Sequence, residues 1–246
     1  MPALTGSQWV WVVAAAFIVG LSKIGLGGVL TVVIPLMAVV FGGKESAGLL
    51  LPIILIGDCL AIVYFKRDAN WRSIRRLMPW VLCGMVIGTY VGWRVDSGTF
   101  TYIIGAAILL CAIVLIIMEW RGDRLTVPQN AYFFMLMGIV GGFTTMIGNA
   151  AGPPMTVYLL ALGMRKDEFA GTYAWLFFII NAIKLPTQMI LWRNIPGSYL
   201  LLALAMIPAL IVGAVVGAAI LKRLPEKPFR YTVIGLTVLA AVRVFI

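Results

Sequence analysis

The stretch IGNAAGPP, residues 147–154, interrupts an otherwise continuous apolar sequence. It follows the run AYFFMLMGIVGGFTTM and precedes the run MTVYLLALGM. Two glycines, an asparagine and two consecutive prolines disfavour a helix interior, although proline is accepted in a first helical turn. The stretch therefore predicts the end of one helix and the start of another. The second helix, residues 154–162, would be only about 14 Å long, so we expect it to form half of a helical hairpin.

The composition places this break inside a membrane protein. Hydrophobic residues make up 62% of the 246 residues and charged residues 11%, whereas a soluble domain is about half apolar and about a quarter charged. The chain contains about ten apolar segments, with no alternating strand pattern, and this predicts an all-α integral membrane protein rather than a barrel. The segments are residues 9–21, 26–41, 47–65, 77–93, 100–118, 131–147, 154–162, 169–191, 199–221 and 229–246.

The net charge of +10 is explained by the loops between these segments. With ten segments the loops alternate between two faces, and Lys and Arg gather on one of them, notably in residues 66–76. The other face holds only Lys44, Arg94, Arg193 and Arg243. The positive-inside rule makes the basic face cytoplasmic and places both termini outside. Nucleic acid is therefore not expected as a partner.

The two halves of the chain match each other at regular positions. A shift of 123 residues places Asp58 on Asn181, and a shift of 129 places Pro79 on Pro208. Five segments per half is an odd number, so the second half must enter the membrane from the opposite side. Further matches in the same order are Ile24-Gly25 with Ile147-Gly148, Glu45 with Glu168, Gly84 with Gly213, Gly88 with Gly217, Arg94 with Arg223, Phe100 with Phe229 and Tyr102 with Tyr231.

This pattern predicts two inverted transmembrane repeats, residues 1–120 and 129–246, joined by a cytoplasmic linker at residues 121–128. Each repeat begins with a broken or re-entrant helical hairpin. The architecture is typical of secondary transporters, whose binding sites lie near the membrane midplane at interrupted helices.

The counterpart of the opening stretch is SKIGLGG, residues 22–28. Inverted symmetry would bring the helix N-terminus after each break toward one central region. Helix N-termini carry free N–H groups and a partial positive charge, and glycine lets the backbone approach a ligand closely. The alternative is that these glycines only allow tight packing. The predicted anion-binding residues at the two breaks are Lys23, Gly25, Gly27, Gly28, Gly148, Asn149 and Gly152.

Polar groups within apolar segments are the other candidates, because an intramembrane charge marks a pathway or a pair. Lys184 lies deep in AWLFFIINAIKLPTQMI, and Asn181 shares its helix face. We expect the lysines Lys184 and Lys23 to attract an anion and the asparagines to donate hydrogen bonds. Asp58 either pairs with Lys184 or Lys23 and only fixes packing, or it orients a lysine or exchanges a proton.

Thr144, Thr145 and Tyr173 are further candidate hydrogen-bond donors to an anion, although Thr commonly bonds its own helix backbone.

Other classes of function find little support. The chain has no histidine and three cysteines, and it lacks phosphate-loop and dinucleotide motifs. We therefore predict no enzyme activity, no metal site and no cofactor. A cation transporter would need more buried oxygen or thiol ligands.

Five stretches in fixed order add a resemblance that covers nearly the whole chain. They are GLSKIGLGGVLTVVIPLM at residues 20–37, AGLLLPIILIGDCLAIVYFKRDANW at 47–71, LMPWVLCGMVIGTYVG at 77–92, GIVGGFTTMIGNAAGPPMTVYLL at 138–160 and FFIINAIKLP at 177–186. Together they resemble the sulfite exporter TauE/SafE family of small bacterial anion permeases.

The resemblance implies a secondary transporter in the bacterial inner membrane that moves sulfite, an organosulfonate or a related oxyanion by alternating access. Its partners would be this small anion and the lipid bilayer. An anion channel, or a carboxylate transporter with the same midplane site, is the alternative. Both breaks hold fewer glycines than the family often has, which leaves the substrate open.

Overall fold

The computed structural model describes residues 4–24, 30–65, 68–94, 130–149 and 151–225, together with the single residues 113, 117, 228, 231, 232 and 235. All regular structure within these residues is helical, in agreement with the predicted all-α class. The predicted segments 100–118 and 229–246, apart from those single residues, and the linker 121–128 lie outside the described residues. The elements are α1 (Gly6–Ile24), α2 (Leu30–Phe41), α3 (Gly43–Tyr64), α4 (Trp71–Arg94), α6 (Ala131–Gly148), α7 (Gly152–Ala161), α8 (Lys166–Thr187), the π-helical turn η2 (Gln188–Trp192), α9 (Gly197–Ala205) and α10 (Ile207–Arg223).

Several of these helices are suited to cross a membrane. By length and composition, three of the described spans qualify, namely Gly6–Ile24, Glu45–Tyr64 and Lys166–Trp192. The helices α9 and α10 qualify together as a fourth, but they are bent by 50°. The sequence predicted one continuous segment here, at residues 199–221. The bend follows from Pro208 in the first turn of α10, because proline lacks the N–H and its ring clashes with the preceding turn.

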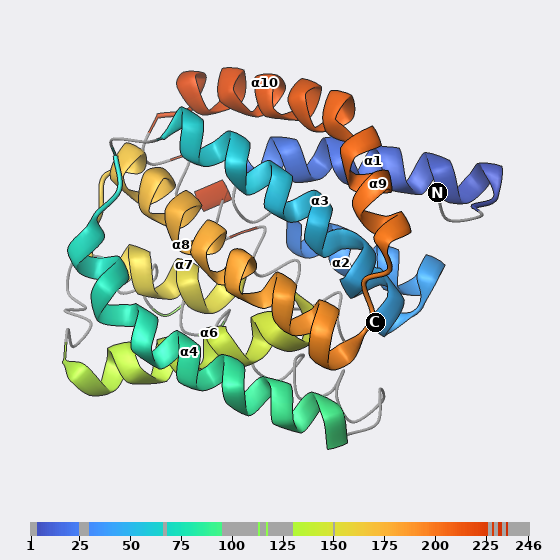
Figure 1. Ribbon diagram of the computed structural model, residues 1–246. Helices are drawn as coiled ribbons and strands as arrows, with labels where there is room; N and C mark the ends of the chain where they lie inside the picture. The colour runs from blue at the N-terminus through green and yellow to red at the C-terminus, as the bar shows by residue number, and fades with distance from the viewer. Residues whose placement is uncertain are drawn as a thin grey trace.

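The helices form two close pairs on either side of a central pair. Figure 1 shows α1 beside α10 at one side of the molecule and α4 beside α6 at the other, with α3 and α8 between them. The helix α3 contacts both α1 and α8, and α8 also contacts α4. The helices α3 and α8 therefore lie at the centre of the described helices.

Glycines allow both outer pairs to approach closely. At each of four glycines, an added Cβ would lie about 2 Å from a backbone carbonyl oxygen of the partner helix. Close backbone contact through small residues is a common way to join helices in a membrane. The contacts are Gly20 with Leu210, Gly213 with Phe17, Gly142 with Val81 and Gly84 with Ile139.

The short helix α7 lies inside the protein. All residues from Gly152 to Leu159 are buried, and the Tyr158 hydroxyl donates to the Ser73 carbonyl on α4 at 3.0 Å. A helix that is apolar and buried on all sides packs inside a bundle rather than at its surface. This placement brings the N-terminus of α7 into the interior of the molecule.

Candidate functional site

The break in the second half of the chain is made by Asn149. The helix α6 ends at Gly148, and Asn149 takes a left-handed conformation with φ 55° while its backbone N–H bonds the Thr145 carbonyl at 3.1 Å. Asparagine tolerates this conformation better than most residues. The helix α7 then begins at Gly152, and no side chain among the described residues caps its N-terminus. Asn149 therefore ends α6 and turns the chain toward α7.

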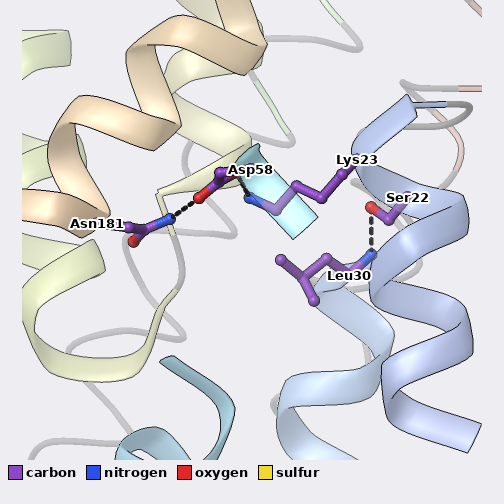
Figure 2. A network of polar contacts seen from close by, with 5 residues as sticks. All are labelled: Ser22, Lys23, Leu30, Asp58 and Asn181. Carbon is purple, nitrogen blue, oxygen red and sulfur yellow. Dashed lines mark hydrogen bonds and ion pairs between the residues drawn. The ribbon is translucent and has the colours of Figure 1, made fainter. Parts of the chain in front are cut away.

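The break in the first half is bridged by a side chain. The Ser22 hydroxyl near the end of α1 accepts a hydrogen bond from the Leu30 N–H at the start of α2, at 3.2 Å (Figure 2). This bond satisfies one of the free N–H groups of the α2 N-terminus. Three predicted site residues, Gly25, Gly27 and Gly28, come between these helices in the sequence and lie outside the described residues.

A buried ion pair joins three helices at the centre. The Lys23 Nζ atom on α1 lies 2.6 Å from Asp58 Oδ1 on α3, and Asn181 Nδ2 on α8 donates to Asp58 Oδ2 at 2.7 Å (Figure 2). All three residues are buried. The Lys23 ammonium also lies 4.8 Å from the centre of the Phe177 ring, which adds a cation–π attraction. Of the two lysine partners that the sequence left open for Asp58, the structure has Lys23.

Lys184 is held in a different way. Its side chain is fully buried, and its ammonium donates to the Thr145 carbonyl and to Asn149 Oδ1. Both acceptors belong to the last turn of α6 and the residue that ends it, where the helix carries a partial negative charge. No carboxylate of the described residues pairs with Lys184. The Lys184 ammonium is therefore hydrogen-bonded to uncharged oxygens.

Asn149 connects this lysine to the central helix. Its Oδ1 accepts from Lys184, and its Nδ2 lies 3.5 Å from the Ala47 carbonyl on α3. The sequence predicted Asn149 as a donor to a ligand, whereas the structure shows it as an acceptor for the lysine and a weak donor to α3. Gly152 is buried at the start of α7, three residues further along the chain.

Gln188 belongs to the same region and was missed by the sequence reasoning. Its side chain is fully buried, and its Nε2 donates to the Met146 carbonyl at 3.3 Å, beside the Thr145 carbonyl that binds Lys184. Its Oε1 has no hydrogen-bond partner among the described residues. The spacing of Asn181, Lys184 and Gln188 is that of one helix face, so this spacing was the available signal.

The other candidate donors, Thr144, Thr145 and Tyr173, are all buried. The Thr144 hydroxyl donates to the Val140 carbonyl of its own helix at 2.8 Å, as the alternative for threonine anticipated. Tyr173 is buried and stacks on Phe177 with ring centres 4.3 Å apart. Within the described ranges, no group of three or more His, Cys, Asp or Glu side chains is placed to hold a metal ion.

The centre of the molecule carries an excess of positive charge. The charged residues that are buried among those described are Lys23, Asp58 and Lys184. Asp58 compensates Lys23, and the charge of Lys184 is left without a compensating carboxylate among the described residues.

Of three comparisons with known proteins, one gives a match. Searches of curated proteins and of solved structures gave no match. The family model described as sulfite exporter TauE/SafE matches residues 12–244, nearly the whole chain, and confirms the resemblance carried by the five sequence stretches. The chain therefore belongs to the sulfite exporter TauE/SafE family of membrane transporters.

Proposed function

We propose that the protein is a secondary transporter that moves a small anion, such as sulfite, an organosulfonate or a related oxyanion, across the bacterial inner membrane by alternating access. The observation that carries the proposal is the buried positive charge of Lys184, which no described carboxylate compensates. A buried cation is costly unless it is paired. A bound anion would supply the missing partner, and family membership supports an anionic substrate in general.

The Lys184 ammonium has one N–H donor that the described hydrogen bonds do not use. An ammonium group has three N–H donors, and two of them are directed to Thr145 and Asn149. The third is available to an anion oxygen. The N-terminus of α7, which begins at Gly152 three residues after Asn149, adds the Gly152 N–H and a partial positive charge in the same region. Its next two residues are prolines without an N–H, and the Met155 N–H bonds the Ala151 carbonyl.

The proposed site follows from both breaks. It contains Lys23 and Asn181 around Asp58, and Lys184 with Asn149 at the end of α6. We propose that the backbone at Gly148 and Gly152, and at Gly25, Gly27 and Gly28 in the first half, completes it. In this arrangement Asp58 orients Lys23, and an anion that reaches Lys23 competes with the Asp58 carboxylate for its ammonium.

Alternating access is supported by contacts that repeat between the halves. The contact of Gly20 with Leu210 corresponds to that of Gly142 with Val81, at shifts of 122 and 129 residues. The contact between Asp58 and Asn181 joins two residues 123 positions apart, which are each other's counterparts in the proposed repeat. Counterparts that touch lie beside the axis relating the repeats, and carriers built in this way place their substrate site there.

Uptake into proteoliposomes tests the proposal. The purified protein should take up at least one anion from a panel of sulfite, sulfate, organosulfonates and carboxylates, with saturation and with counterflow. Replacing Lys184 by Ala should reduce uptake by about 10- to 100-fold, the cost of losing one charge-assisted hydrogen bond. Conductance that does not saturate would favour the channel instead.

A matched control lies on the same helix. Lys166 donates to the Leu221 and Leu224 carbonyls at 3.2 and 3.1 Å, so it also binds carbonyls at the end of a helix, but away from the buried centre. Lys166→Ala should keep wild-type uptake. Equal uptake in the Lys184→Ala and Lys166→Ala proteins, with both folded, would remove Lys184 from the proposed site.

A further inference from the structure

The Lys184 ammonium occupies a place where carriers with broken helices often bind a coupling ion. In such carriers, carbonyl groups at the C-terminal end of an interrupted helix coordinate Na⁺ or a proton. Here α6 is interrupted at Asn149, and two oxygens at its end, the Thr145 carbonyl and Asn149 Oδ1, both accept from Lys184. The negative end of the helix favours a cation at this point.

The chemistry of the oxygens indicates which cation would fit. Thr145 and Asn149 supply a backbone carbonyl and a side-chain amide oxygen, neither of them charged. Gln188 adds a buried amide oxygen without a hydrogen-bond partner among the described residues, and its Nε2 is fixed to the neighbouring Met146 carbonyl. Divalent ions such as Ca²⁺ are usually bound with several carboxylates, so this set of oxygens suits a monovalent cation.

We propose that the end of α6, Asn149 and Gln188 form a monovalent-cation site that the Lys184 ammonium fills permanently. The protein then carries its own cation at the broken helix, and its anion needs no sodium ion to bind beside it. Removal of the side chain would open the site to Na⁺ or to a small ammonium ion. The inference rests on the proposed function only in that the substrate is an anion bound next to this cation.

Thermal unfolding of the Lys184→Ala protein in detergent tests the cation site without any substrate. Sodium chloride or methylammonium chloride should raise the Tm of this variant relative to choline chloride, saturably and by on the order of 5 °C. The wild-type Tm should be the same in all three salts, because its site is already filled. A Lys184→Ala protein whose Tm is the same in all three salts overturns the inference.

Two variants separate this site from a general effect of salt. Lys184→Ala combined with Gln188→Leu should lose most of the sodium effect, because one oxygen of the site is gone. Lys166→Ala, which removes the α8 lysine that binds the Leu221 and Leu224 carbonyls at the end of α10, should show no sodium effect. If sodium raises the Tm of Lys166→Ala as much as that of Lys184→Ala, the rise is a general effect of salt, and the inference is overturned.

Transport gives a second, independent measurement, and its comparison of the wild-type protein in two media does not depend on any variant folding. Wild-type uptake should be equal in sodium and in choline media, whereas sodium should restore part of the uptake lost in Lys184→Ala. A wild-type protein that requires sodium would overturn the inference. A sodium-dependent Tm in Lys184→Ala with no anion uptake by the wild type would support the cation site and count against the proposed function.

Discussion

A buried lysine lies at each of the two helix breaks, and the two lysines are bound in different ways. At the first break, Lys23 forms an ion pair with Asp58. At the second, Lys184 binds only the uncharged oxygens of Thr145 and Asn149 among the described residues. The lysine at the first break thus has a carboxylate partner, and the lysine at the second break has none among the described residues.

The difference originates in one pair of residues. In the repeat that the sequence predicts, Asp58 of the first half corresponds to Asn181 of the second, and the two side chains are hydrogen-bonded to each other. The asparagine keeps the shape and the hydrogen bond of an aspartate but lacks its charge. In that repeat the second half has no counterpart of the Asp58 carboxylate, and Lys184 of this half is the buried lysine without a carboxylate partner among the described residues.

The largest expected effect comes from breaking the ion pair of the first half. Lys23→Ala leaves the fully buried Asp58 carboxylate with Asn181 as its remaining partner. An unpaired buried charge costs about 3–5 kcal/mol, and we expect the free energy of unfolding in detergent to fall by that amount. Lys184→Ala leaves only neutral oxygens behind and should cost less, about 1–3 kcal/mol.

A double variant separates charge from packing in this comparison. Adding Asp58→Asn to Lys23→Ala removes the unpaired carboxylate and should recover most of the lost stability. If the double variant is no more stable than Lys23→Ala alone, the loss is one of packing. Equal losses for Lys23→Ala and Lys184→Ala would mean that the two lysines are held by interactions of the same strength.

The next effect concerns a feature that the two halves share. A Cβ added at Gly20 would lie 2.1 Å from the Leu210 carbonyl oxygen, and one at Gly142 would lie 2.0 Å from that of Val81. Because backbone cannot move aside cheaply, each helix pair must separate. Gly20→Ala and Gly142→Ala should each lower the free energy of unfolding by about 1–3 kcal/mol.

The control for these substitutions is Gly197, where an added Cβ would meet nothing within 4 Å. Gly197→Ala should change the free energy of unfolding by no more than about 0.5 kcal/mol. Losses of similar size at Gly20 and Gly142 would support corresponding helix contacts in the two halves. A loss at only one of them would argue against the repeat.

The parts of this arrangement that the sequence predicts are those encoded locally. Proline and glycine mark the break around Asn149, because they act on the backbone at their own positions. Charges in apolar runs single out Lys23, Asp58 and Lys184 for the same reason. The Asp58–Asn181 match also required no structure, since it is a comparison of the chain with itself.

The features that the sequence leaves open depend on contacts between helices. Whether Asp58 pairs with Lys23 or Lys184 is decided by how α1 and α8 cross α3. Gln188 lies near the end of an apolar segment, and its buried position depends on η2, the π-helical turn that continues α8 after Pro186. Helical spacing from Lys184 gave a signal for it, but not its contact with Met146.

The smallest effect returns to the two helix N-termini. Ser22→Ala removes the hydroxyl that accepts from the Leu30 N–H and should lower the free energy of unfolding by about 1 kcal/mol, whereas Ser22→Thr keeps an acceptor and should lose less. An unchanged stability in Ser22→Ala would mean that another acceptor takes this N–H.

No described side chain caps α7, so the proposed partner of its N-terminus is the anion. A transported anion should then stabilise the wild-type and Ser22→Ala proteins by the same amount, because its proposed main contacts are the α7 N-terminus and Lys184.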